Sequence, residues 1–274
     1  MNILEIFTLS FMQRAFLAGI ISAFLLSLSG VFVTLKRLSF FGDGIAHASL
    51  AGIAIGVILG INPLWMALLV AIVLTSILYL LERKTTIPTD AIIGFIFTFG
   101  MASGIVIISL KKGYQPELVS FLFGNILSLS WSDLLLTLIL GTMVVLFLIL
   151  SQRTLALTIL DREEAYLRGL KVETLEFFFY MFLAITVVLG LKLLGIVLVS
   201  ALLIIPPITA KLISSSFKKM LFNSVIIGEV TVFTGLFISY LLDIPSGAVI
   251  VLVGISIFAL IFCIMSLKKK VFSR

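Results

Sequence analysis

The sequence has little charge and few of the residues on which enzymes depend. Asp, Glu, Lys and Arg together make up 12% of its 274 residues, and it contains one histidine and one cysteine. Soluble domains carry about 25% charged residues, so a soluble globular fold is excluded. Cys263 cannot form an internal disulfide. One histidine and the lack of a His-Glu-x-x-His motif argue against an intramembrane enzyme.

The sequence also lacks a nucleotide-binding loop and any long hydrophilic loop. No Gly-x4-Gly-Lys-Ser/Thr occurs, and the one Gly-x4-Gly pair, Gly190 with Gly195, continues into Ile196. The chain therefore has no P-loop for ATP phosphates. Because apolar runs use up most of the chain, we expect a single transmembrane domain over residues 1–274. Any large partner domain must then be another polypeptide.

Hydrophobic residues dominate instead, at 61% of the chain, with a mean hydropathy of +1.32. An ordinary soluble domain is about 45–50% apolar. We therefore predict an all-α, polytopic membrane protein. The apolar runs long enough for a hydrocarbon core of about 30 Å number about nine. They cover residues 12–35, 43–61, 63–81, 91–110, 132–150, 175–191, 194–212, 221–242 and 247–267.

Basic residues predict the orientation, because Lys and Arg in short loops stay on the cytoplasmic side. If nine spans alternate, five basic clusters share one side, and the N-terminus lies outside and the C-terminus inside. Lys111 and Lys112 disagree. The net charge of +6 follows from such loops and requires no nucleic acid partner. The agreeing clusters are Lys36/Arg37, Arg83/Lys84, Arg153, Lys218/Lys219 and Lys268 to Lys270.

Asp43 and His47 open the second apolar run. On a helix, residues four apart share one face, so this carboxylate and imidazole could bind one divalent cation. Ionisable groups at membrane depth cost about 2.5–3.5 kcal/mol each, which favours a functional role. Two ligands leave a coordination shell incomplete. The alternative is that Asp43 only caps the start of the helix.

Small residues at every fourth position of the second run predict a ridge against which a neighbouring helix packs closely. Such a ridge places Asp43 and His47 beside a seam between helices and away from lipid. A second small pair, Gly100 and Gly104, marks the fourth run. The ridge consists of Gly44, Ala48, Gly52, Gly56 and Gly60.

Two further ionisable residues lie within apolar runs. Glu229, in the eighth run, has two open interpretations, a structural hydrogen bond or a role in a transport path. Lys192, near the outer turn between the sixth and seventh runs, is interpreted as snorkelling to the membrane interface.

The longest polar stretch covers residues 151–176 and predicts a short amphipathic helix. Asp161 can cap it, and Gly169 can stop it after about two turns. This helix is either a solvated connector or a knob that docks into a soluble motor. Apolar or aromatic side chains that could enter a groove are Leu160, Ala165, Tyr166 and Leu170.

Several motifs together resemble the ABC-3 family of metal-ion permeases, the membrane subunits of bacterial ATP-binding-cassette importers. The resemblance covers nearly the whole chain and is closest to the zinc-uptake type. The motifs are residues 35–43 running into 47–52, Phe121 to Gly124, Asp161 with Ala165 and Gly169, residues 192–195 leading to 202–206, and residues 243–247.

The resemblance implies a type II ABC importer permease in the cytoplasmic (inner) membrane of a bacterium or archaeon. It implies a homodimer around the translocation path, two copies of a separate ATPase and an extracytoplasmic metal-binding protein. It also implies that a divalent metal crosses as substrate, with zinc favoured over manganese or iron. No cofactor is expected to be bound by this chain.

The resemblance also assigns residues. It implies Asp43 and His47 as metal ligands, and a coupling segment near 151–175 that contacts the ATPase. A single histidine cannot form a multi-histidine zinc site in one subunit, whereas two subunits could supply two imidazoles and two carboxylates. Asn125 stands where the family commonly has an acidic residue. The coupling residues are Asp161, Glu164, Ala165 and Gly169.

Two residues on the outer side are candidates for docking the binding protein. Arg14 opens the first run and Asp243 begins the turn to Gly247. A basic group there can pair with an acidic residue of the partner. The alternative is that Arg14 only anchors its helix at the interface.

The competing function is a self-contained secondary carrier driven by an ion gradient through Asp43, Glu229 and Lys192. Such carriers often have helices that break at the midplane. Pro206-Pro207 in the seventh run could produce such a break.

Overall fold

The computed structural model describes residues 10–110 and 129–272. Over these ranges the chain is helical and contains no strand, which confirms the all-α prediction. The motif at Phe121 to Gly124, Asn125 and the pair Lys111/Lys112 lie outside the described residues. The helices are α1 (Ser10–Lys36), α2 (Phe41–Ala48), α3 (Leu50–Leu59), α4 (Pro63–Lys84), α5 (Thr89–Ser109), α7 (Trp131–Leu160), α8 (Arg162–Leu167), α9 (Val172–Leu194), α10 (Ile196–Ile213), α11 (Phe217–Leu242) and α12 (Ser246–Phe272).

Nine segments in the described part of the chain are long and apolar enough to cross a membrane, with α2 and α3 together forming one. The predicted number of spans is thereby confirmed. One boundary is wrong, because the fifth span was predicted at 132–150 and α7 continues to Leu160. Leu155 and Thr158 are buried in this extension, so packing keeps the polar stretch helical. The predicted coupling segment thus begins as the end of a long helix.

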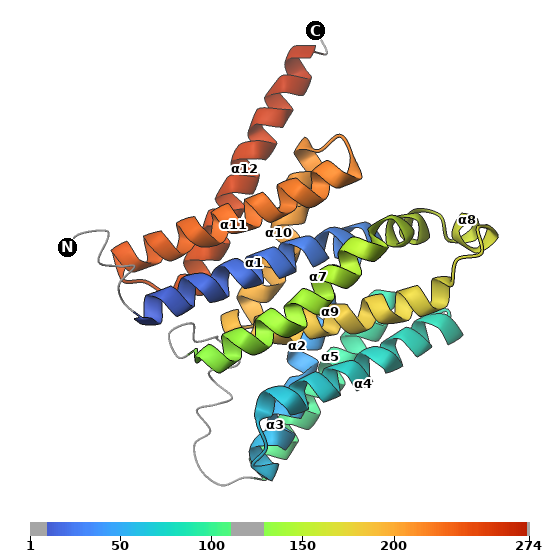
Figure 1. Cartoon of the computed structure of the whole chain (residues 1–274), viewed down its shortest axis with the longest axis vertical. Helices are drawn as coiled ribbons and strands as arrows, with labels where there is room; N and C mark the ends of the chain where they lie inside the picture. The colour runs from blue at the N-terminus through green and yellow to red at the C-terminus, as the bar shows by residue number, and fades with distance from the viewer. Residues whose placement is uncertain (1–9, 111–128, 273–274) are drawn as a thin grey trace.

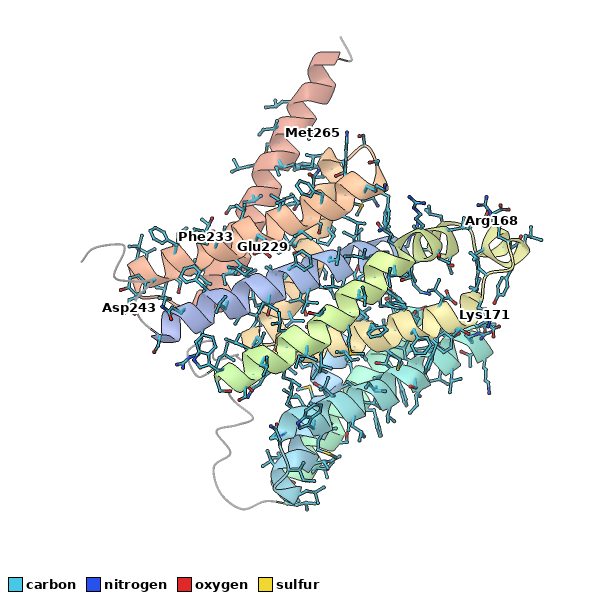
Figure 2. The ribbon with its side chains drawn as sticks, in the orientation of Figure 1. Arg168, Lys171, Glu229, Phe233, Asp243 and Met265 are labelled. Atoms are coloured by element: carbon cyan, nitrogen blue, oxygen red, sulfur yellow. The ribbon has the colours of Figure 1, made fainter. Side chains whose placement is uncertain are left out.

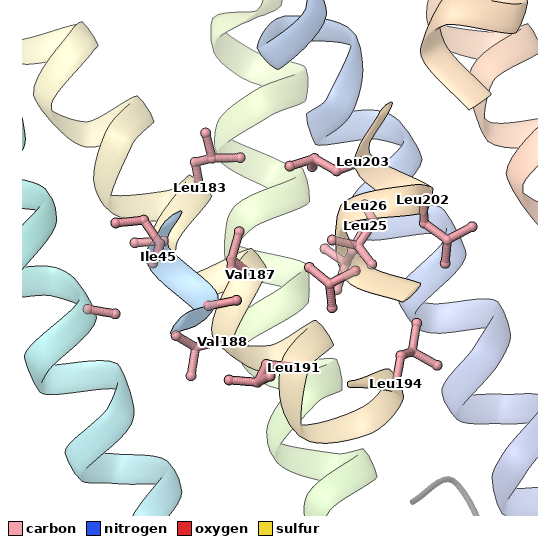
Figure 3. Packing of buried hydrophobic residues seen from close by; sticks show 14 of the residues in the cluster. Leu25, Leu26, Ile45, Leu183, Val187, Val188, Leu191, Leu194, Leu202 and Leu203 are labelled. Carbon is pink, nitrogen blue, oxygen red and sulfur yellow. The ribbon is translucent and has the colours of Figure 1, made fainter. Parts of the chain in front are cut away.

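The centre of the bundle is formed by α1 and α9. Buried residues make up 78% of the most apolar window of α1 and 72% of that of α9, against 17% for α12. Figure 1 shows α12 projecting away from the other helices, and α1 contacts α7, α9, α10 and α11. Figure 3 shows the aliphatic contacts of this centre, which include Leu25, Leu26, Ile45, Val187, Leu191, Leu202 and Leu203.

The helix ends at Lys36, Lys84 and Leu160 lie together with the start of α9 and with α8, on the right of Figure 1. Ion pairs join these ends, including Lys36 with Glu176 and Arg83 with Glu173. We call this side of the molecule the basic end. The opposite end holds the starts of α1, α4, α7 and α12.

The second span is close-packed, as the small residues predict, but its ridge faces two helices. An added Cβ would clash with Ile93 of α5 at Gly44 and with the Met66 carbonyl of α4 at Gly52. The span is interrupted at Ser49, whose hydroxyl donates to the carbonyl of Ala46 at 2.7 Å. The predicted close approach of neighbouring helices is confirmed, with α5 at Gly44 and α4 at Gly52.

The seventh span does not break at its two prolines. α10 stays helical through Pro206 and Pro207. Proline at 207 removes the amide that would bond the carbonyl of Leu203. Gly30 of α1 packs directly on that carbonyl, where an added Cβ would lie 2.1 Å from its oxygen. The neighbouring helix thus covers the exposed carbonyl, as membrane helices with proline require.

Candidate functional site

The turn before α2 places Asp43 and His47 close to the basic end. α1 ends at Lys36, and Arg37 adopts the left-handed conformation with φ 61°. The amide of Leu38 donates to the carbonyl of Val33 at 2.9 Å, which closes the helix end. The chain then reverses at once, so Asp43 falls in the first turn of α2.

His47 is oriented by the backbone of its own helix. Its Nδ1 lies 2.9 Å from the carbonyl oxygen of Asp43, and its ring meets the edge of Phe97 with centroids 4.8 Å apart. A carbonyl oxygen can only accept, so Nδ1 carries the proton. The lone pair is then on Nε2, which is the arrangement that metal-binding histidines use. The side chain is half-buried.

The carboxylate of Asp43 bonds a different helix. Ser200 of α10 donates its hydroxyl to Oδ1 of Asp43 at 2.9 Å. Phe40 occupies the N-cap position of α2, and the carboxylate of Asp43 is directed to α10. Asp43 therefore makes no side-chain cap bond, but it lies in the first turn of α2, where a negative charge is stabilised by the helix dipole. Ser200 was not predicted, because 157 residues separate it from Asp43.

A pocket of about 230 Å³ opens beside Asp43 and brings a second carboxylate to it. Asp90, in the first turn of α5, lines this pocket. The sequence held one signal for it, because an acidic residue that opens the fourth span lies on the same side of the membrane as Asp43. The lining consists of Phe40, Asp43, Gly44, Asp90, Ile93, Gly94 and Phe97.

Carboxylate oxygens and an imidazole nitrogen can bind a divalent cation of the first transition row. Within residues 10–110 and 129–272, no three His, Cys, Asp or Glu side chains form a group that could hold a metal ion. An ion at Asp43 would therefore take further ligands from water or from another chain. Such incomplete protein coordination suits a metal ion that binds briefly during transport better than one that is bound permanently.

The coupling segment forms the short helix that the sequence predicts. Asp161 caps α8 by accepting from the amide of Glu164 at 2.9 Å. Glu164 in turn accepts from Arg168 at 2.7 Å. Gly169 ends the helix with φ 72°, a conformation that favours glycine.

Burial separates the side chains of this segment into two groups. Ala165 is fully buried against its own chain, so it offers no side chain to a partner. Leu160 is 77% exposed and Leu167 is 83% exposed. The apolar surface of the segment is therefore formed by these two leucines and by Tyr166, which is 45% exposed.

The two predicted docking residues lie at the opposite end. Figure 2 shows Asp243 far from Arg168 and Lys171 of the basic end. Asp243 is exposed and ends α11 with φ 52°. Arg14 is half-buried in the first turns of α1. Both positions agree with the predicted side of the membrane, and docking remains a prediction.

Glu229 and Lys192 lie elsewhere. Glu229 is half-buried on α11 and lies one turn from Phe233, as Figure 2 shows. The ring of Phe233 packs against that of Phe16 on α1, with centroids 5.5 Å apart. Lys192 is in the last turn of α9. The residues that line the Asp43 pocket come from α2, α5 and the turn before α2, so this pocket does not join the three groups of the competing carrier hypothesis.

Comparisons with known proteins agree with this arrangement. A family model described as the ABC 3 transport family matches residues 8–265. The chain is 33% identical to the manganese transport system membrane protein MntC of Halalkalibacterium halodurans, over 98% of this chain and 92% of that protein. It is 28% identical to the high-affinity zinc uptake system membrane protein ZnuB of Haemophilus influenzae, over 90% and 94%.

A solved structure has the same fold. It is described as PsaBC from Streptococcus pneumoniae in complex with Fab. The two chains are 29% identical, the match covers 95% of each, and the TM-score is 0.84.

Proposed function

The chain belongs to the ABC 3 transport family, and from this membership we propose that it carries manganese as the permease subunit of an ATP-binding-cassette metal importer. The observation that supports manganese is the pocket shared by Asp43 and Asp90. Carboxylate and water ligands suit manganese, whereas zinc prefers imidazole and thiolate. The sequence motifs favour zinc, but they did not include Asp90. Relatives named for manganese and for zinc are 33% and 28% identical to this chain.

Two copies of the chain would complete the metal coordination. Each copy would supply Asp43, His47 and Asp90, and the half-buried imidazole of His47 contacts the ring of Phe97 on α5. A dimer around a two-fold axis would bring two such sets together. The basic end would face the cytoplasm of a bacterium or archaeon, since basic residues stay on that side.

The partners would bind at opposite ends. An ATPase subunit would contact Leu160 at the end of α7 and Leu167 at the end of α8, because large exposed apolar side chains that lie close together mark interaction sites. A metal-binding protein would dock outside, near Arg14 and Asp243. The chain would act as a transport permease, with ATP hydrolysed by the partner.

The experiment is metal uptake into vesicles that contain the chain with its ATPase and binding protein. We expect ATP-dependent accumulation of manganese that zinc inhibits only at higher concentration. Asp90→Asn should reduce manganese uptake more than zinc uptake, because it replaces a charged carboxylate with a neutral amide, and manganese prefers carboxylate ligands. Preferred uptake of zinc would contradict the choice of metal. Uptake that an ion gradient drives without the ATPase would support the competing carrier.

A further inference from the structure

The carboxylate of Glu176, on α9, is buried and forms ion pairs with two basic side chains from distant segments of the chain. Its side chain is 10% exposed. Its Oε1 lies 2.8 Å from Nζ of Lys36, the last residue of α1. Its Oε2 lies 3.0 Å from the guanidinium of Arg162, the first residue of α8. A buried charge is costly unless it is paired, so the position of α8 is tied to that of α1.

Tyr180, one turn further along α9, extends this connection to the start of α2. The ammonium group of Lys36 lies 4.9 Å from the centroid of its ring. The ring of Phe41 also packs against the ring of Tyr180, with the two centroids 5.8 Å apart. Phe41 is the first residue of α2 and is fully buried. Asp43 follows two residues later.

The hydroxyl of Tyr180 connects this network to α5, which forms the other wall of the Asp43 pocket. It donates to Oε2 of Glu82 at 2.6 Å. The second oxygen of Glu82 accepts from the hydroxyl of Thr89 at 2.9 Å. Thr89 is the first residue of α5, and the next residue is Asp90. Contacts thus run from α8 through Glu176, Lys36 and Tyr180 to both helices that line the Asp43 pocket.

We propose that Glu176 is a positioning residue that transmits movement of α8 to the two helices around the Asp43 pocket. This inference rests on the proposed function, because it needs a motor that moves α8. Two short ion pairs on one buried carboxylate make α8, α9 and the end of α1 move together. Close-packed elements of this kind shift between discrete arrangements.

Glu173, three residues earlier on α9, provides a matched control. It also forms an ion pair with an arginine, Arg83 of α4, and it likewise contacts α8, since it accepts from the hydroxyl of Tyr166 at 3.4 Å. Its side chain is 52% exposed, so solvent screens the pair and weakens it. Glu173→Gln and Glu176→Gln therefore make the same chemical change on one helix, but only the second removes a buried connection.

The test uses the full transporter in vesicles and measures manganese ions moved per ATP hydrolysed. We expect Arg162→Gln and Glu176→Gln each to reduce this ratio about tenfold while hydrolysis continues. Arg162→Lys should keep most of the wild-type ratio of manganese moved to ATP hydrolysed, since lysine keeps the positive charge. Glu173→Gln should leave it unchanged. The double variant Arg162→Gln/Glu176→Gln should be no worse than Glu176→Gln alone, because that change already removes the contact with Arg162.

Three results would overturn the proposal. Uptake and hydrolysis could fall in parallel in Arg162→Gln, which would indicate a structural role. The ratio could stay at the wild-type value in both variants. The effects could add in the double variant, which would place Arg162 against the ATPase itself. If Glu176→Gln does not insert, the comparison of Arg162→Gln with Arg162→Lys decides. A wild-type transporter that moves no metal would instead contradict the proposed function.

Discussion

At the basic end, side chains from segments far apart in the sequence bond one another, whereas at the opposite end the described side-chain bonds join near neighbours. Lys36 and Glu176 are 140 residues apart, and Tyr180 and Glu82 are 98 apart. These bonds connect α1, α4 and α9. If one of these helix ends is displaced, either the other ends move with it or the bonds between them break.

The opposite end is built from local caps. Ser130 and Asp133 form a capping box at the start of α7. Asn62 accepts from the amide of Leu64 at 3.0 Å, and Ser239 donates to the carbonyl of Ile244 at 2.6 Å. A cap stabilises its own helix without fixing the neighbours. The described side-chain bonds therefore join different helices at the basic end, whereas these caps each stabilise a single helix end or turn.

The largest expected effect comes from a change in the second span, close to the basic end. His47→Ala removes the only imidazole of the chain, so manganese uptake should fall about 10- to 100-fold, as expected when a metal site loses a supporting group. Uptake into vesicles measures the loss, and copurification of the ATPase controls for folding. Uptake at the wild-type rate in correctly inserted protein would remove His47 from the metal path.

A substitution on the exposed side of α8 tests the basic end directly. Leu167→Glu should leave the chain inserted but reduce binding of the ATPase at least several-fold, because it places a charge in an apolar contact. Ala165→Glu is the comparison, since it would bury a carboxylate inside the chain and destabilise α8 itself. Pull-down of the ATPase measures both. Equal binding by Leu167→Glu and wild type would place the contact elsewhere.

Charge reversal at Arg14 tests the opposite end. Arg14→Glu should weaken docking of the binding protein several-fold at low salt and less at high salt, because exposed charges are screened. Titration of the binding protein at two ionic strengths gives the effect. Unchanged affinity at low salt would favour the alternative, in which Arg14 only anchors α1.

The smallest effect is expected for a local cap. Ser130→Ala removes the side chain that accepts from the amide of Asp133, which costs about 0.5–2 kcal/mol of helix stability. Transport per ATP should stay at the wild-type value, because this cap connects no second helix. Thermal unfolding and the transport ratio check the two statements. A fall in the ratio would show that the opposite end is coupled as tightly as the basic end.

The spans and the position of Asp43 could be predicted from the sequence because each depends on residues near in the chain. Run length alone predicts a membrane span. The four-residue spacing of Asp43 and His47 places them on one helix turn. The end of α7 at Leu160 was missed, since tertiary packing extends a helix through polar residues.

The partners of Asp43 and the network at Glu176 could not be predicted. Ser200 lies 157 residues from Asp43, and Glu176 lies 140 residues from Lys36. No local pattern marks such pairs, because they depend on how the helices pack. The continuity of α10 through Pro207 has the same origin, since Gly30 of another helix covers the carbonyl of Leu203, which Pro207 leaves without its amide.

The most direct test of the account is manganese uptake by Asp43→Asn in the complete transporter. Asparagine keeps the size of the side chain and can still accept from Ser200, but it has lost the charge that would attract a cation. The account predicts that uptake falls more than about tenfold while the ATPase stays bound. Full uptake by this variant, in correctly inserted protein, would contradict a metal path through the second span.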